Sequence, residues 1–105
     1  MSIKRVSNIQ AFQEELDSSD NILIKFEADW CNPCKAMTPI VEDFAKNHPQ
    51  LTVISVDIEG EGIYDVLTKY GVRSVPTFIR LKTGAVIRSA AGTITRSELL
   101  NFAEG

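Results

Sequence analysis

Two cysteines, Cys31 and Cys34, are the residues of this chain best suited to covalent chemistry, and only Asn32 and Pro33 separate them. Cysteines at this spacing can close a small-ring disulfide, which an incoming thiolate can open again. We expect a helix to begin at Cys31, so unpaired backbone N–H groups and the positive end of the helix dipole would favour its thiolate. Cys34, one turn further in, would be more shielded. The pair therefore indicates thiol–disulfide exchange, in which Cys31 is the nucleophile and Cys34 resolves the mixed disulfide.

Three other interpretations of the cysteine pair are less well supported. A zinc site needs about four ligands, and the only further soft donor is His48, which we expect to be a solvated residue at a helix end. We therefore expect no metal. A purely structural disulfide would close too small a loop to stabilise the fold much. Buried inert cysteines remain an alternative, although they rarely occur as a pair directly after Trp30 and around Pro33.

The residues around the pair predict the elements that position it. Residues 22–26 form a short apolar run, interrupted once by Lys25, which is typical of a central strand covered on both faces. A helix with Pro33 in its first turn is predicted to run to about residue 47, and Pro39 should kink it. The cysteines are thus expected where a strand leads into a helix.

The rest of the chain shows alternating elements followed by a hairpin. Hydrophobic periodicity predicts a helix over about residues 8–16, a strand over 51–58, a helix over 63–70, strands over 77–81 and 86–90, and a final helix after Thr95. The first helix follows a capping pattern from Ser7 to Gln10, and the last one a similar pattern from Thr95 to Glu98. This order implies an α/β fold whose mixed sheet carries helices on both faces.

Size, composition and charge narrow the function classes. The chain has 105 residues, of which 44% are apolar and 24% are charged. We therefore expect one compact domain over residues 1–105. No segment approaches the roughly 18 consecutive apolar residues of a membrane helix, and the first ten residues do not resemble a secretory signal. We therefore expect a cytoplasmic protein without a membrane partner. The net charge is −3 and the basic residues are scattered, which argues against nucleic acid as a ligand.

Two segments carry a resemblance to a known family. Ala-Asp-Trp-Cys-Asn-Pro-Cys-Lys at residues 28–35 resembles the active-site segment of the thioredoxins, and Tyr-Gly-Val-Arg-Ser-Val-Pro-Thr at residues 70–77 resembles their second signature. The two segments occur in the expected order and separation. Further matches at Phe26, Pro39, Lys82, Gly84 and Gly92 extend the resemblance over nearly the whole chain.

The resemblance implies a thioredoxin fold, with a central mixed sheet flanked by helices on both faces and the disulfide at a strand's carboxyl end. It also implies a cis peptide before Pro76, although a plain turn proline is the alternative. Val75 would offer its backbone to a substrate strand beside a shallow apolar groove. The residues expected at this substrate-binding surface are Trp30, Asn32, Pro33, Val72, Arg73, Val75, Pro76 and Gly92.

The activity implied by the resemblance is reduction of disulfides in protein substrates, with the dithiol restored by an electron donor of the thioredoxin-reductase type. No bound cofactor is required, and we expect a monomer. A binding module or accessory subunit, in which the surface around Trp30 and Pro76 does the work and redox chemistry is incidental, is the rival function. Reduction of insulin by the wild type but not by Cys31→Ser would distinguish the two.

The family pattern is broken at Lys25, where thioredoxins usually carry a buried aspartate that moves a proton to or from the resolving thiol. The family's partner lysine aligns with Ser55, two residues before Asp57. We hypothesise that acid and base have moved, so that Lys25 and Asp57 pair and both belong to the catalytic group. The alternative is a tolerated lysine whose flexible stem reaches solvent. Asn32 and Glu27 also depart from the usual residues, and the first of these should tune the redox couple.

Overall fold

The computed structural model describes residues 3–104, which form five strands and four helices. The strands are β1 (Ile3–Asn8), β2 (Asn21–Glu27), β3 (Thr52–Glu61), β4 (Thr77–Lys82) and β5 (Ala85–Ala91). The helices are α1 (Ile9–Ser18), α2 (Asn32–Asn47), α3 (Tyr64–Tyr70) and α4 (Arg96–Glu104). Every helix and strand predicted from the sequence is present, with ends shifted by at most a few residues.

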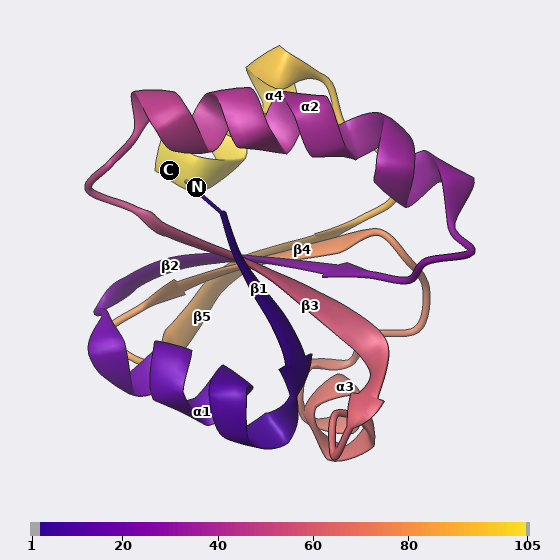
Figure 1. Ribbon diagram of the computed structural model, residues 1–105. Helices are drawn as coiled ribbons and strands as arrows, with labels where there is room; N and C mark the ends of the chain where they lie inside the picture. The colour runs from indigo at the N-terminus through magenta and orange to yellow at the C-terminus, as the bar shows by residue number, and fades with distance from the viewer. Residues whose placement is uncertain (1–2, 105) are drawn as a thin grey trace.

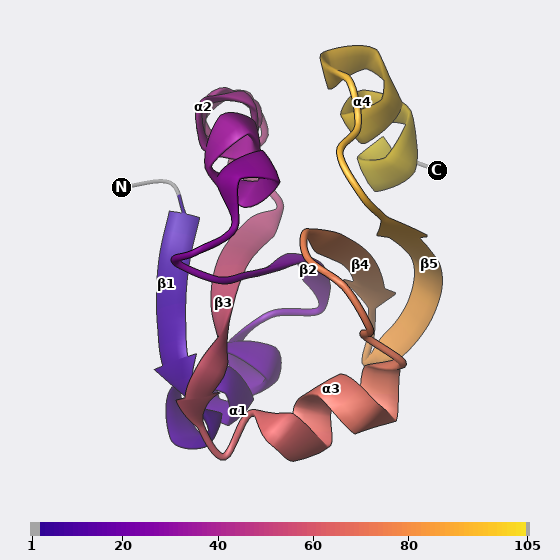
Figure 2. The same ribbon diagram turned by 90° about the vertical axis from the view of Figure 1, so that its right-hand side faces the viewer.

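The sheet lies between two helical layers. Figure 1 shows α2 and α4 on one face of the sheet and α1 and α3 on the other, and Figure 2 shows the same layers from the side. The strand order is β1-β3-β2-β4-β5. Strands β1, β3 and β2 run parallel, whereas β4 is antiparallel to β2 and β5 is antiparallel to β4. The predicted mixed sheet with helices on both faces is therefore confirmed.

Strand β1, which pairs with β3 along one edge of the sheet, was not predicted from the sequence. Only Ile3 and Val6 of this strand are buried, three residues apart, so its sequence lacks the alternation by which a strand is recognised. Long-range pairing with β3 makes it a strand. Asn8 ends it and also caps α1, since its side chain accepts a hydrogen bond from the N–H of Ala11 at 2.8 Å. The cap is thus Asn8 and not the predicted Ser7.

Strand β2 is the centre of the fold and is buried on both faces, as its apolar run predicted. Alternate side chains point to opposite faces of the sheet. Leu23 packs in the cluster under α2 and α4, while Ile24 and Phe26 pack in the cluster under α1 and α3. Full burial of each such side chain contributes about 1.5–3 kcal/mol. Lys25 shares the face of Leu23 and is buried with it, which places a cation beneath α2.

Helix α2 begins directly after Cys31, which is its N-cap, and has Pro33 in its first turn. The helix continues through Pro39 and ends at Asn47, with His48 as its C-cap. That histidine is half-buried and stacks on the ring of Phe44, with 4.0 Å between the ring centroids. It is therefore packed on the helix end and less solvated than the sequence analysis expected.

Candidate active site

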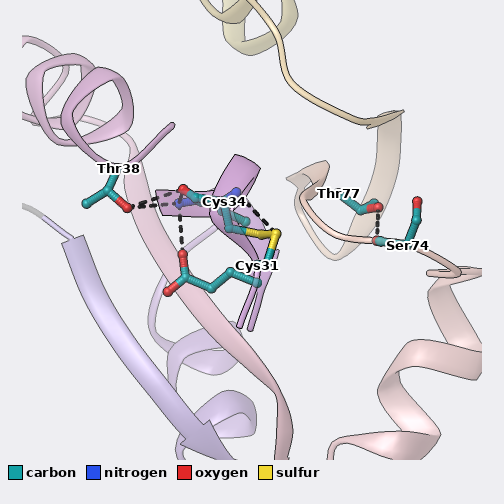
Figure 3. Close-up of a disulfide and its surroundings, with 7 residues drawn as sticks. Cys31, Cys34, Thr38, Ser74 and Thr77 are labelled. Atoms are coloured by element: carbon teal, nitrogen blue, oxygen red, sulfur yellow. Dashed lines mark hydrogen bonds and ion pairs between the residues drawn. A yellow bond between two sulfur atoms is a disulfide. The ribbon is translucent and has the colours of Figure 1, made fainter. Parts of the chain in front are cut away.

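The structure contains a disulfide between Cys31 and Cys34, whose Cα atoms are 5.3 Å apart. It lies between the carboxyl end of β2 and the start of α2, as predicted. The backbone N–H of Cys34 donates a hydrogen bond to Sγ of Cys31 at 3.1 Å, and Figure 3 shows this contact. A donor at a helix N-terminus stabilises negative charge on the sulfur that it faces. The local geometry therefore favours a thiolate on Cys31.

Both sulfurs are shielded in this oxidised state. Cys31 is 4% exposed and Cys34 is 2% exposed. They form a small buried cluster with Ala28, against which Ile58 and Val75 pack. The predicted order of shielding holds, but the difference is small. Hydrogen bonding from the first turn of α2, rather than burial, is what makes the two sulfurs unequal.

The segment before β4 packs against the disulfide. Its Val75–Pro76 peptide bond is cis, as the family resemblance implied. The carbonyl of Pro76 accepts a hydrogen bond from the N–H of Gly92 at 2.8 Å, and the hydroxyl of Thr77 donates to the carbonyl of Ser74 at 2.7 Å. Figure 3 shows Ser74 and Thr77 on the side of the cysteines that carries the sulfurs. This segment is thus held at both ends beside the cysteine pair.

An open hollow adjoins the same segment, and most of its lining is apolar. It is formed by Trp30, Ile58, Leu67, Val72, Arg73, Ser74 and Val75. Four of these residues were predicted at a substrate-binding surface, whereas Ile58, Leu67 and Ser74 were not. The position of Ile58 near the carboxyl end of a predicted strand was the available signal for that residue.

The other predicted surface residues lie around this hollow without lining it. Asn32 and Pro33 are exposed in the first turn of α2. Pro76 is buried behind Val75, and Gly92 reaches the site through its hydrogen bond to Pro76. Trp30 is the most prominent of the lining residues, since 62% of it is exposed.

Lys25 lies beneath the first turn of α2 and does not reach solvent. Its Nζ donates to the carbonyl of Cys34 at 2.9 Å and to the hydroxyl of Thr38 at 3.3 Å. Its ionic partner is Glu27, whose Oε1 is 2.8 Å from Nζ. Figure 3 shows the Thr38 hydroxyl directed at the backbone of Cys34. The structure therefore brings a cation, a carboxylate and the second cysteine together.

The predicted pairing of Lys25 with Asp57 is wrong. Glu27 follows Lys25 by two positions on β2 and so shares its face of the sheet. Asp57 stands opposite Glu27 on β3, two pairs beyond Ser55, the partner of Lys25. The carboxylate of Asp57 instead accepts a hydrogen bond from the backbone N–H of Glu59 at 2.9 Å. The basis on which Asp57 was assigned to the catalytic group is thereby lost.

Two further structural findings bear on the class of site. Within residues 3–104 no three or more His, Cys, Asp or Glu side chains gather closely enough to hold a metal ion. No helix in the same range combines the length and the apolar character needed to cross a bilayer.

A family model described as Thioredoxin matches residues 3–105 of the chain. The chain belongs to the thioredoxin family. Among curated thioredoxins, the H-type protein of Fagopyrum esculentum is 36% identical over 92 residues, which span 88% of this chain and 77% of that protein. Thioredoxin 1 of Synechococcus elongatus is 33% identical over 90 residues, which span 85% of this chain and 82% of that protein.

Solved thioredoxin structures have the same fold. Oxidised mitochondrial thioredoxin 3 from Saccharomyces cerevisiae superposes with a TM-score of 0.83 at 27% identity, covering 98% of this chain and 94% of the yeast chain. Plasmodium falciparum thioredoxin gives a TM-score of 0.85 at 28% identity and covers 96% of both chains. Membership of the thioredoxin family, together with the Cys31–Cys34 pair, identifies this chain as a protein thiol–disulfide oxidoreductase.

Proposed function

We propose that the chain works as a reductant of protein disulfides, with Cys31 as the attacking sulfur. The observation that supports this assignment is the hydrogen bond from the Cys34 N–H to Sγ of Cys31 at the N-cap of α2. In the reduced protein the same donor would stabilise a thiolate on Cys31. Cys34 has no equivalent donor from the helix start, because it lies inside the first turn. Cys34 is therefore the resolving thiol.

The exchange takes place in two steps, attack by Cys31 and resolution by Cys34. The Cys31 thiolate attacks one sulfur of the substrate disulfide, a mixed disulfide forms, and the other substrate sulfur leaves with the electron pair and takes up a proton. Cys34 then loses its proton and attacks Sγ of Cys31. The Cys31–Cys34 bond forms, the mixed disulfide breaks, and the second substrate thiol is released. The substrate gains two electrons, and the dithiol is oxidised to the disulfide.

Substrate recognition is proposed to combine backbone pairing with apolar contact. An extended substrate segment beside Val75 would place its cysteine over the disulfide and a neighbouring apolar side chain in the hollow next to Trp30. Asn32 and Pro33 are exposed at the start of α2 and would border this segment. Such recognition depends little on the substrate's own sequence, which suits a reductant that serves several proteins.

The partners follow from the direction of electron flow. A donor of the thioredoxin-reductase type would return the disulfide to the dithiol, and no bound cofactor is needed between the two. We place the chain in the cytoplasm as a monomer that uses neither nucleic acid nor membrane. A reducing compartment would keep Cys31 and Cys34 in the dithiol state that the attack requires.

Trapping of the mixed disulfide tests the proposed roles. Cys34→Ala should accumulate a covalent adduct with a protein disulfide, and peptide mass spectrometry should locate the adduct at residue 31. Cys31→Ser should form no such adduct, and wild type should reduce insulin. An adduct formed at residue 34 by Cys31→Ser, with none formed by Cys34→Ala, would reverse the roles, and absence of any adduct in both variants would overturn the proposal.

A second function is favoured by the exposure of Trp30 beside the hollow, which is an unusual position for the only tryptophan of the chain. In this case the surface binds a protein partner and redox chemistry is incidental. A protein that fails to reduce insulin in its dithiol form, while Cys31→Ser/Cys34→Ser still supports a partner's activity, would favour this function. Reduction at a substantial rate favours the reductant.

A further inference from the structure

The exchange reaction described above makes no use of Lys25, although this residue lies directly beneath the cysteine pair. Only 3% of its side chain is exposed, and all its contacts are made inside the protein. Three acceptors surround the ammonium, and one of them is the carbonyl of Cys34 at 2.9 Å. A buried cation needs such partners because removal of a charge from water is energetically costly. The arrangement is a built site for a positive charge.

Each partner of Lys25 has a separate part in holding this charge. Glu27 supplies the opposite charge at 2.8 Å and is itself bound by Arg5 of β1, whose Nη1 lies 3.6 Å from Oε2. Thr38, one turn along α2 from Cys34, accepts from Nζ and donates to the Cys34 carbonyl at 3.3 Å. The ammonium is therefore fixed against the first turn of α2 from both the strand and the helix.

The resolving step creates a need for positive charge at Cys34. This cysteine must become a thiolate at a position that is almost completely shielded from water, and burial in apolar surroundings disfavours a thiolate. The N–H donor at the helix start is directed at Cys31 and so does not serve Cys34. Lys25 is a charged group bound to this residue, since its Nζ donates to the backbone carbonyl of Cys34 at 2.9 Å. An opposite charge nearby favours ionisation of a thiol.

We propose that Lys25 is a positioning residue for the resolving step, in which its ammonium, held by Glu27 and Thr38 beneath Cys34, stabilises the Cys34 thiolate. The inference rests on the proposed function, because it concerns the second half of that exchange. The proton of Cys34 leaves to water, and the thiolate attacks Sγ of Cys31. The bond between Cys31 and the substrate breaks, and the substrate sulfur departs with the electron pair and takes up a proton.

The residues that face Lys25 from the neighbouring strands do not neutralise the charge by which its ammonium would stabilise the Cys34 thiolate. Ser55 on β3 and Phe78 on β4 stand opposite it, and neither carries a charge. Asp57 lies two pairs further along β3, opposite Glu27, and its carboxylate accepts a hydrogen bond from the N–H of Glu59. Glu27 is therefore the one carboxylate within the described residues that forms an ion pair with Lys25.

The two halves of the exchange can be followed separately with dithiobis(nitrobenzoate) as the substrate. Attack by Cys31 releases the first thionitrobenzoate, and resolution by Cys34 releases the second. We expect Lys25→Met to slow the second release about tenfold at neutral pH and to move the midpoint of its pH profile upward by about one unit, since one unit corresponds to a tenfold change in ionisation. The first release should change less than about twofold, because Lys25 contacts Cys34 and not Cys31.

Two further substitutions separate charge from hydrogen bonding. Lys25→Arg keeps the charge and should retain a second-release midpoint close to that of the wild type. Lys25→Gln keeps a donor for the Cys34 carbonyl but has no charge, so it should behave like Lys25→Met. If Lys25→Met does not fold, as judged by circular dichroism, the comparison of Lys25→Gln with Lys25→Arg carries the test. A wild-type midpoint in Lys25→Gln would overturn the proposal.

Lys4→Met is the matched control. Lys4 also forms an ion pair with a glutamate, Glu15, at 3.3 Å, but it lies on the surface away from the disulfide. Both releases should be unchanged in this variant. Failure of the proposed function would appear as loss of the first release in the wild type. Failure of the present inference would appear as a normal first release with a second-release midpoint that the loss of charge at Lys25 does not move.

Discussion

The backbone N–H of Gly92 donates to the carbonyl of Pro76 at 2.8 Å and so ties the chain after β5 to the segment that packs on the disulfide. Gly92 has a φ of 94°, a conformation that side chains with a Cβ rarely adopt. No atom within 4 Å would obstruct a Cβ at this position. A side chain at this position would therefore cost only backbone conformational energy. That strain would weaken the hydrogen bond by which Gly92 holds the Pro76 segment.

Gly92→Ala should therefore lower the free energy of unfolding by about 1–2 kcal/mol, the typical cost of a left-handed conformation for a residue with a Cβ. It should also raise KM for a protein disulfide, because the backbone of the Val75 segment would shift. Chemical denaturation and insulin reduction measure the two effects. Gly84→Ala is the control, since Gly84 has a φ of 82° and equal space but lies in the hairpin between β4 and β5. The two variants should lose similar stability, and only Gly92→Ala should change KM.

Arg80 should be a major determinant of stability at the end of the sheet opposite the disulfide. Its guanidinium is buried and donates to the carbonyls of Ala103 at 2.8 Å, Leu81 at 2.7 Å and Ile22 at 3.3 Å, and also to the side chain of Asn21. Burial, and secondarily the nearby Arg88, lower the pKa of Arg80. The group nevertheless remains a cation at neutral pH, because the ordinary pKa of arginine is far above that pH.

Arg80→Leu should cost about 2–4 kcal/mol of unfolding free energy, because each buried carbonyl left without a donor costs about 1–3 kcal/mol and part of this loss is offset by relaxation. Thermal and urea unfolding would measure the change. The rate of insulin reduction per folded molecule should stay unchanged, since none of these contacts reaches Cys31 or Cys34. A loss of less than about 0.5 kcal/mol would mean that α4 is held to the sheet by apolar packing alone.

How far the sequence could predict this molecule depends on how local each signal is. The cysteine pair, the apolar run of β2 and the glycine turn of the hairpin are short patterns, and the elements they predicted are present. Strand β1 was missed because its pairing with β3 is a long-range event and only Ile3 and Val6 of its residues are buried. Because β1 lies at the sheet edge, its other side chains are exposed, and its sequence does not alternate between apolar and polar residues.

The partner of Lys25 in the site was also mispredicted, because it too depends on contacts that local sequence patterns do not determine. Sequence alone indicated that a lysine in a buried strand needs a partner. Asp57 was predicted to be that partner, whereas Glu27, one residue beyond the strand predicted over residues 22–26, was not. The choice between them depends on the reach of each side chain at the carboxyl end of the sheet, which no spacing rule supplies. The hollow beside Trp30 was predicted in part for a related reason, because residues of β3 and α3 join it only through the fold.

Glu98 should make the stability of α4 depend on pH. Hydrogen bonds with the backbone and side chain of Thr95 lower the pKa of this carboxyl. In the predicted capping box, the backbone N–H of Thr95 donates to Oε1 of Glu98 at 2.9 Å, and the backbone N–H of Glu98 donates to the Thr95 hydroxyl at 3.1 Å. A carboxyl whose pKa is lowered by folding stabilises the native state above its unfolded pKa. This contribution is lost as the pH falls through the lower, folded value.

Glu98→Gln should accordingly be less stable than wild type at neutral pH, and the difference should shrink when the pH is brought below the ordinary range of a glutamate. Urea unfolding at neutral and acidic pH would measure it. Glu14→Gln, a change on the exposed face of α1, is the control and should show no comparable pH dependence. A constant difference between Glu98→Gln and wild type at all pH values would contradict this origin of the effect.

Trp30 should govern affinity for protein substrates without affecting the reactivity of the sulfurs. It is 62% exposed and borders the hollow, so its removal takes little from the folded core. An apolar substrate side chain that buries against it would contribute about 1–2 kcal/mol. Trp30→Ala should therefore raise KM for insulin about 5- to 30-fold, while its melting temperature stays close to that of the wild type. Reduction of a small polar disulfide such as hydroxyethyl disulfide, which cannot fill the hollow, should proceed at the wild-type rate.

Tyr64→Ala removes an aromatic residue that is 77% exposed but does not line the hollow, and it should leave both reactions unchanged. If Trp30→Ala slowed the small disulfide as much as insulin, the tryptophan would act on Cys31 itself and the hollow would not be the substrate-binding surface.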